Sequence, residues 1–80
     1  MPIISEIQGI KIYMNFGDGE HNPPHIHGFS GGHDCAIGLD GKVLNKGKMK
    51  EKEIKIIVNF VLQNSSKLNE MWETQKFERI

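Results

Sequence analysis

The chain has 80 residues, and its 10 lysine and arginine residues balance its 10 aspartate and glutamate residues. This length suits one domain with a small core, and a hydrophobic content of 38% excludes a disordered chain. The single cysteine excludes an internal disulfide and a cysteine-based zinc cluster. The longest apolar run, Ile56-Ile57-Val58, excludes a transmembrane protein, and the first residues lack the features of a signal peptide. We therefore expect a cytoplasmic protein.

The first half of the chain predicts antiparallel strands. Ile10, Ile12 and Met14 alternate with polar residues, which predicts a strand over residues 9–16. After a loop that contains two prolines, a second strand is expected over residues 25–30. Glycine pairs and Asp-Gly turns then predict two further strands, over residues 34–39 and 42–45.

The apolar period changes after Gly47 from that of a strand to that of a helix. Ile54, Ile57, Val58 and Val61 recur at helical spacing, which predicts a helix over residues 50–63. A break at Asn64-Ser65-Ser66 precedes a second helix over residues 66–77. The order predicts an α+β fold over residues 1–80, with an antiparallel meander of about four strands and two C-terminal helices packed on one face.

The densest chemical signal is a group of histidines in the acidic first half of the chain. Strand periodicity places His25 and His27 on one face with Phe29, so the two imidazoles can act together. Imidazole both transfers protons near neutral pH and binds metals. Tyr13, on the polar face of the first strand, is a candidate proton donor or a stacking surface for a base.

Three interpretations of this group remain open. In the first, His25 and His27 are an acid and base pair that cleaves RNA through its 2′-hydroxyl without a metal. In the second, they bind zinc or a similar divalent metal, together with a further ligand. The candidates for that ligand are His21, His33, Asp34 and Glu20. In the third, the histidines are structural and pack against Phe29 or Trp72.

A lysine-rich stretch follows the predicted sheet. Residues 42–55 hold six lysines against Glu51 and Glu53, whereas residues 1–41 hold one lysine against five acidic residues. The candidate phosphate-binding residues are Lys46, Lys48, Lys50 and Lys52. The alternative is a solvated helix face, which the interleaved glutamates favour.

Several segments carry a resemblance to a known family. They are the opening Pro2-Ile3-Ile4-Ser5, Gly9-Ile10, the block Pro23-Pro24-His25-Ile26-His27, Ala36-Ile37, Gly41-Lys42-Val43-Leu44, Gly47, and the closing Leu68 and Trp72. The chain resembles a family of small bacterial proteins labelled domain of unknown function 4160. The resemblance implies a compact α+β domain whose gene often neighbours that of another small family, a pairing interpreted as a toxin–antitoxin module. Gly28 stands where the family commonly has alanine, and Lys48-Met49 replaces a frequent leucine-proline before the helix.

The leading hypothesis is therefore a toxin-like protein that acts on RNA, a metal-independent endoribonuclease with His25, His27 and Tyr13 as its site. We expect a small antitoxin-like partner protein, RNA as a second partner, a homodimer through an edge strand, and no membrane. The alternative is a non-catalytic protein-binding or regulatory module whose histidines are structural or hold a metal.

Overall fold

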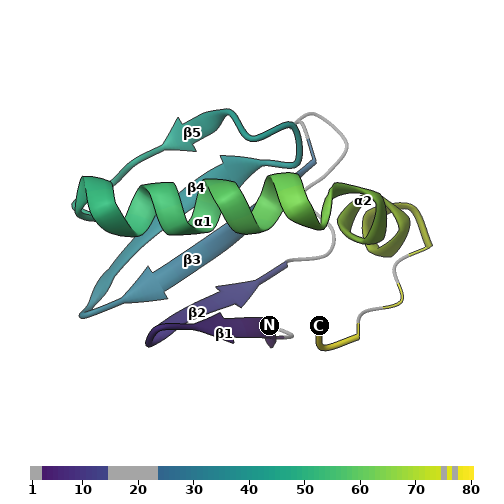
Figure 1. The fold of residues 1–80 in the computed structure, drawn as a ribbon, viewed down its shortest axis with the longest axis horizontal. Helices are drawn as coiled ribbons and strands as arrows, with labels where there is room; N and C mark the ends of the chain where they lie inside the picture. Colours follow the sequence, from purple (N-terminus) through teal and green to yellow (C-terminus); the bar gives the residue numbers. More distant parts are fainter. Residues whose placement is uncertain (1–2, 15–23, 75, 77) are drawn as a thin grey trace.

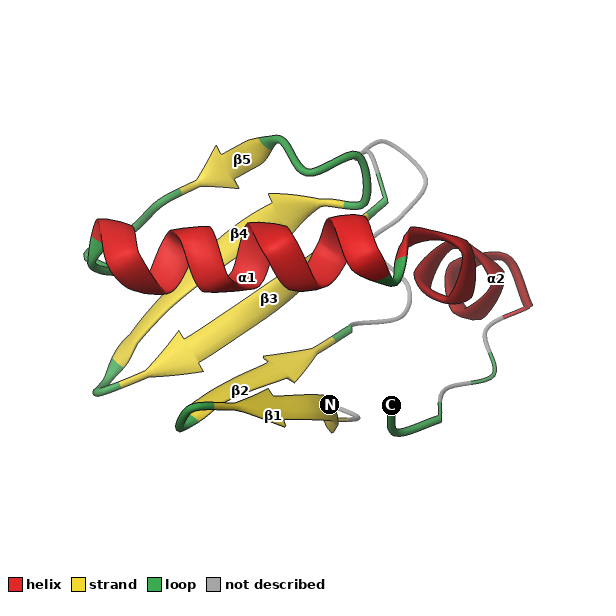
Figure 2. Cartoon of the chain, viewed as in Figure 1, coloured by secondary structure: helices red, strands yellow, loops and turns green. Residues whose placement is uncertain are grey.

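The computed structural model describes residues 3–14, 24–74, 76 and 78–80. Within them the chain forms an α+β fold, a five-stranded antiparallel sheet followed by two helices (Figure 2). The strands are β1 (Ile3–Ile7), β2 (Ile10–Tyr13), β3 (His25–Ser30), β4 (His33–Gly38) and β5 (Val43–Asn45), and the helices are α1 (Glu51–Gln63) and α2 (Ser65–Thr74).

The five strands form a meander in which each pairs with the next along the chain (Figure 1). The β3–β4 hairpin turns at Gly31 and Gly32, both with positive φ, as a tight hairpin requires. At the β4–β5 turn, Asp40 Oδ1 accepts a hydrogen bond from the Lys42 N–H at 2.9 Å. Short turns and local pairing therefore fix the order of the strands.

The expected fold class is confirmed, but the strand number of about four is too low, because β1 precedes the first predicted strand. A register shift between Ile3 and Ser5, a β-bulge, leaves Ile4 and Ser5 both buried. This interrupts the period of two by which a strand is recognised in sequence. The strand predicted over residues 9–16 appears as β2, which ends at Tyr13, and the end of the predicted range lies outside the described residues.

Helix α1 forms because its apolar residues share one face. Ile54, Ile57 and Val61 are buried on that face, and Glu51 and Glu53 in the first turn complement the helix dipole. The helix ends where the Asn64 side-chain amide donates a hydrogen bond to the Phe60 carbonyl. α2 begins at the next residue and ends at Thr74, short of the predicted residue 77, which lies outside the described residues.

The core lies between the sheet and the helices. Figure 1 shows α1 lying across one face of the sheet, with α2 beyond the end of α1. Ile12, Ile26 and Ile37 from the central strands are fully buried with Ile57 of α1, and Leu68 of α2 joins the same cluster. Neither described helix is long and apolar enough to cross a membrane. The face of the sheet opposite α1 is called the open face below.

Candidate functional site

The open face is built by the residues that alternate with the core residues of β2, β3 and β4. Pairing aligns these residues in rows that run across the strands. One row is Lys11, Phe29 and Asp34, and the next is Tyr13, His27 and Ala36. His25 follows one step further, opposite Gly38. Because directly paired residues lie on one face of an antiparallel sheet, these side chains are neighbours.

Four aromatic rings meet near the α2 end of this face, and we call them the ring cluster: Tyr13, His25, His27 and Trp72. The Tyr13 ring stacks on the His27 ring with centroids 5.2 Å apart and planes 10° apart. The His25 ring meets the His27 ring edge to face at 4.9 Å, and lies 5.7 Å from the half-buried Trp72 ring of α2. The structure thus brings the three predicted residues of the acid–base site together.

Tyr13 is held as a neutral phenol. Burial raises the pKa of Tyr13 above its usual value of 10.0, and the negative charge of Asp34 raises this pKa further. At neutral pH the hydroxyl therefore carries its proton and can donate it or a hydrogen bond. The charge of Asp34 acts on Tyr13 from the neighbouring row, across β3.

A cavity of about 460 Å³ opens on the same face, lined by Ile3, Lys11, Tyr13, Phe29 and Asp34. We call it the open-face cavity. Ile3 on the edge strand β1 and Phe29 on the central strand β3 are each 41% exposed, so the cavity has two apolar side chains on its lining. The cavity shares Tyr13 with the ring cluster, so the two features form one continuous surface.

One of the predicted metal ligands, His33, lies away from the two histidines of the ring cluster. His33 is the first residue of β4 and pairs with Ser30, at the opposite end of the β3–β4 hairpin from His25. Because His33 is two residues from Cys35, it belongs to the face of the sheet that α1 covers. It therefore does not join His25 and His27, and the part of the chain that the structure describes holds no group of three metal-ligating residues. His21 and Glu20 lie outside the described residues.

Cys35 is buried on the core side of β4. Burial raises the pKa of its thiol, a hydrogen bond with the Gly28 backbone lowers it, and the charges of Asp34 and Glu53 raise it further. A buried thiol that resists ionisation is a small hydrophobic side chain rather than a nucleophile.

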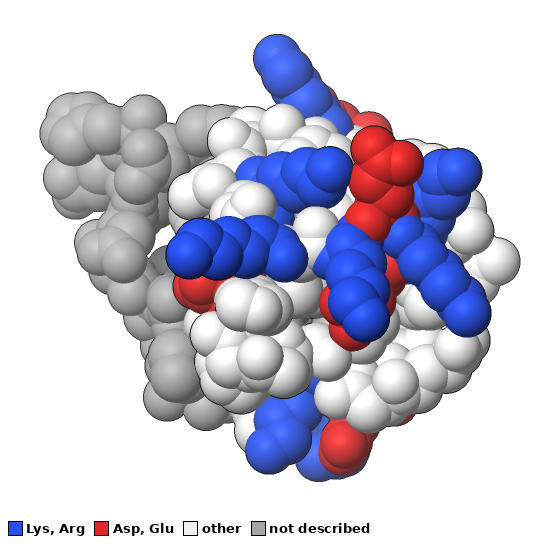
Figure 3. Space-filling view, turned by 90° about the vertical axis from the view of Figure 1, so that its left-hand side faces the viewer, with Lys and Arg blue, Asp and Glu red and all other residues white. Residues whose placement is uncertain are grey.

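The predicted phosphate-binding lysines gather at the end of the molecule where α1 begins. Lys46, Lys48, Lys50 and Lys52 are all exposed. Figure 3 views this end and shows basic side chains crowded together with acidic side chains between them. Lys46 lies 3.6 Å from Glu51 in an exposed ion pair. This end of the molecule lies close to Asp34, since a Cβ at Gly47 would contact the Asp34 carbonyl oxygen. His25 lies at the other end of β3, away from these lysines.

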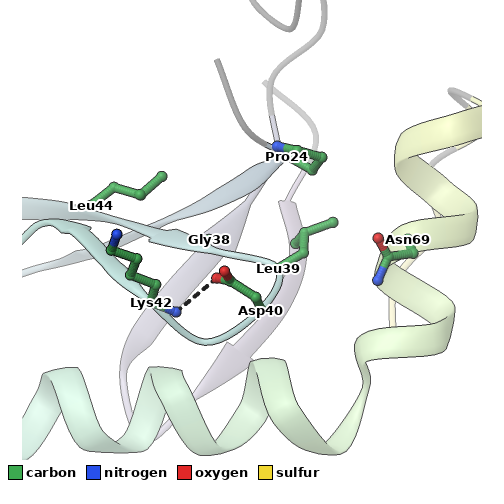
Figure 4. A pocket seen from close by; sticks show the side chains of 7 residues that line it. All are labelled: Pro24, Gly38, Leu39, Asp40, Lys42, Leu44 and Asn69. Atoms are coloured by element: carbon green, nitrogen blue, oxygen red, sulfur yellow. Dashed lines mark hydrogen bonds between the residues drawn. The ribbon is translucent and has the colours of Figure 1, made fainter.

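A second cavity, of about 420 Å³, lies between the β4–β5 turn and α2 (Figure 4). Asp40, Lys42 and Leu44 line one side, and Asn69 of α2 faces them across the opening. Pro24, directly before His25, also lines it. Its lining includes neither histidine of the ring cluster.

Sequence reasoning does not select Lys11 and Phe29 as site residues, and it considers Asp34 only as a metal ligand. Alternation alone places Phe29 with the histidines and Lys11 with Tyr13. The row itself depends on strand register, which aligns Lys11, Phe29 and Asp34 from three separate strands. Alternation within one strand does not reveal how neighbouring strands are aligned.

Comparison with known proteins gives one family. The model of the domain of unknown function DUF4160 matches residues 9–73 of this chain. No curated protein and no solved structure shows a significant match. The matched range contains β2 to β5, α1 and nearly all of α2, and with them the whole ring cluster.

Proposed function

The chain belongs to the family of the domain of unknown function DUF4160, and from this starting point we propose that it is a toxin-like endoribonuclease. It acts in the bacterial cytoplasm as one component of a toxin–antitoxin module, and its partner is a small antitoxin-like protein. The observation that carries the proposal is the contact between His25, His27 and Tyr13 on the open face. Three side chains that can carry protons thus adjoin a surface with room for a substrate.

The proposed reaction is cleavage of RNA through its own 2′-hydroxyl. One histidine removes the 2′-hydroxyl proton, and the resulting oxygen attacks the adjacent phosphorus. The bond from phosphorus to the 5′-oxygen breaks, and the second histidine gives that oxygen a proton. The products are a 2′,3′-cyclic phosphate and a 5′-hydroxyl, and the route needs no metal.

The neighbouring residues support this assignment. Trp72 and Tyr13 contact the two imidazoles on either side, which limits their movement and preorganises the pair. The neutral Tyr13 hydroxyl donates a hydrogen bond to a phosphate oxygen, where negative charge develops. The lysines at the start of α1 contact the RNA backbone beyond the Asp34 end of the face.

The test measures cleavage of a labelled RNA by the purified protein and identifies the product ends. His25→Ala and His27→Ala should each lower the rate about 10²- to 10⁴-fold, the usual contribution of a general acid or base. His33→Ala is the matched control, because His33 is exposed and lies outside the ring cluster. Unfolding curves of each variant establish that the fold is kept. Wild-type rates in both ring-cluster variants would refute the mechanism.

Induction of the protein in bacteria tests the toxin assignment separately. Growth should stop with the wild type and with His33→Ala, and continue with the His25→Ala/His27→Ala double variant at equal protein level. Arrest by all three would mean that the toxicity is independent of the histidines. Normal growth with the wild type would reject the toxin assignment.

A second candidate function is a non-catalytic protein-binding module. The observation in its favour is the exposure of Ile3 and Phe29, apolar side chains of the kind that partner proteins cover. In that case the ring cluster is structural, and His25 packs on Trp72 to hold α2 against the sheet. Replacement of the histidines would then lower the stability of the protein, and neither the wild type nor the variants would cleave RNA.

A further inference from the structure

We propose that the open-face cavity binds an unpaired guanine base of single-stranded RNA. This inference rests on the proposed function, since it names the nucleotide that the same face recognises beside the cleaved bond. It is carried by the chemistry of the cavity lining, in which an exposed aromatic ring, a carboxylate and a lysine converge.

The aromatic part of the lining provides a stacking surface. Phe29 is 41% exposed at the centre of the face, and the Tyr13 ring lies one row away on the neighbouring strand. Exposed aromatic rings on a sheet are a recurring means of binding unpaired bases, because every base has an apolar face to stack. The cavity volume of about 460 Å³ leaves space for one base. A duplex, whose bases are already stacked, cannot use this surface.

The carboxylate of Asp34 determines which base fits. Asp34 pairs directly with Phe29 in the sheet and lines the cavity, so its oxygens lie beside the stacking ring. An ionised carboxylate only accepts hydrogen bonds. Guanine presents two adjacent donors, N1–H and the N2 amine, which match the two carboxylate oxygens. Adenine and cytosine each present a ring-nitrogen acceptor there, which an ionised carboxylate repels.

Lys11 completes the lining on the other side of Phe29. It is exposed, so its ammonium can reach a phosphate of the bound nucleotide. Glu6 lies opposite Lys11 on β1, and Arg79 lies 3.7 Å from the Glu6 carboxylate. Arg79 thus offsets the negative charge of Glu6 beside Lys11.

The row order places this base next to the proposed reaction. Phe29 and His27 are two residues apart on one strand and point to the same face, a spacing of about 7 Å. A nucleotide whose base stacks on Phe29 therefore has its sugar and phosphate close to the ring cluster. The cavity is a recognition site adjacent to the bond that His25 and His27 act on.

The experiment measures binding without cleavage. The probes are fluorescent 2′-O-methyl oligouridylates with one central guanine, inosine or adenine, and affinity is read from fluorescence anisotropy. Inosine keeps N1–H but lacks the N2 amine. Wild-type protein should bind the guanine probe about tenfold more tightly than the adenine probe, with inosine between them.

Two variants assign the contacts. Phe29→Ala should weaken binding of all three probes about tenfold, because it removes the stacking surface. Asp34→Asn should abolish the guanine preference and favour adenine, since an amide has one donor and one acceptor to match the adenine edge. The controls are Leu62→Ala, an exposed apolar residue on α1, and Glu73→Gln, an exposed acid on α2. Both should bind like the wild type.

The outcomes separate this inference from the proposed function. Guanine preference that depends on Asp34, without RNA cleavage, would support the cavity and reject the enzyme. Cleavage by the histidines with equal affinity for all three probes would reject the guanine site and keep the enzyme. No binding of any probe, or capture of a protein through Phe29 instead, would overturn the inference.

Discussion

Gly28 lies where β3 passes beneath α1, and its missing side chain determines how close the two can come. A Cβ at this position would be 2.5 Å from Ile57 Cδ1 and 3.3 Å from Cys35 Sγ. Alanine at this position therefore needs a smaller or displaced neighbour on α1. The fit between strand and helix is set by the pair Gly28 and Ile57 rather than by either residue alone.

Gly28→Ala should consequently destabilise the protein by about 1 kcal/mol or more through overpacking. Ile57→Val alone should cost about 0.5–1.5 kcal/mol, because it removes a buried methyl group. In the double variant the valine makes room for the new Cβ, so its destabilisation should be smaller than the sum of the two. Urea unfolding of all four proteins gives the coupling energy. Additive effects would mean that the Ile57 side chain does not limit this contact.

Cys35 gives the protein a weakness at alkaline pH. Burial raises the pKa of the folded thiol, so the unfolded chain releases this proton at a lower pH than the folded chain does. The stabilisation is fully present below the unfolded thiol pKa and is lost as pH rises through the folded one. Stability should therefore begin to fall near pH 8.5, the usual thiol pKa, by at most about 1.4 kcal/mol per pH unit from this group.

The measurement is urea unfolding at pH 7, 8, 9 and 10 for the wild type and Cys35→Ala. The variant should be less stable at pH 7, since it leaves a small cavity, yet lose less stability between pH 8 and pH 10. Tyr13→Phe serves as the comparison, because the raised pKa of this phenol places its effect at higher pH. Equal slopes for the wild type and Cys35→Ala would contradict the assignment.

At the scale of elements, the connection from β5 to α1 depends on one glycine. Gly47 has a φ of 58°, and a Cβ there would collide with the carbonyl oxygen of Asp34. The turn is held by Asn45, whose side-chain oxygen accepts a hydrogen bond from the Gly47 N–H at 3.0 Å. The start of α1 is thus fixed against β4 by close backbone contact.

Gly31 provides a matched control for this contact, because it has the same φ of 58° and no atom within 4 Å of a Cβ. Gly31→Ala should cost about 1–2 kcal/mol, the penalty of the left-handed conformation alone. Gly47→Ala should cost clearly more, because β4 and the connection must also separate. Thermal unfolding of the two variants measures the difference. Equal destabilisation would show that the clash with Asp34 is easily relieved.

The elements also show what sequence could predict. Strict alternation predicted β2, the proline loop and the glycine pair on either side of residues 25–30 predicted β3, and helical spacing predicted α1 nearly to its ends. β1 was missed because its bulge buries two consecutive residues, Ile4 and Ser5. For the site, alternation predicted the shared face of His25 and His27. It could not predict that Asp34 would lie directly beside Phe29, since that depends on the register between β3 and β4.

At the scale of the whole molecule, balanced charge conceals a basic end. Lys48, Lys50 and Lys52 surround the start of α1, where positive charge is unfavourable for the helix dipole. Glu51 and Glu53 in the first turn offset part of this cost, and a bound phosphate would offset more of it. Under the proposed function the basic end and the open-face cavity have separate roles, with backbone affinity at the basic end and base preference at the cavity.

The variant Lys48→Gln/Lys50→Gln/Lys52→Gln tests this separation with the guanine and adenine probes. Each lysine that binds a phosphate should contribute about 0.7 to the slope of log affinity against log salt, so the triple variant should have a slope shallower by up to about 2. The guanine preference should be unchanged, and the stability equal or higher. Lys76→Gln, an exposed lysine beyond α2, is the control and should keep the wild-type slope. An unchanged slope in the triple variant would mean that these lysines do not bind RNA.

The two edges of the sheet are not equivalent. On β1 the Ile80 N–H donates a hydrogen bond to the Ile4 carbonyl at 2.6 Å, so the C-terminal residues already occupy part of that border. β5 is the other outermost strand, with Val43 and Leu44 each 40% exposed. A further strand is therefore expected to join the sheet at β5 rather than at β1. Two copies joined β5 to β5 would each use this more open border, so association through β5 alone would end at a pair.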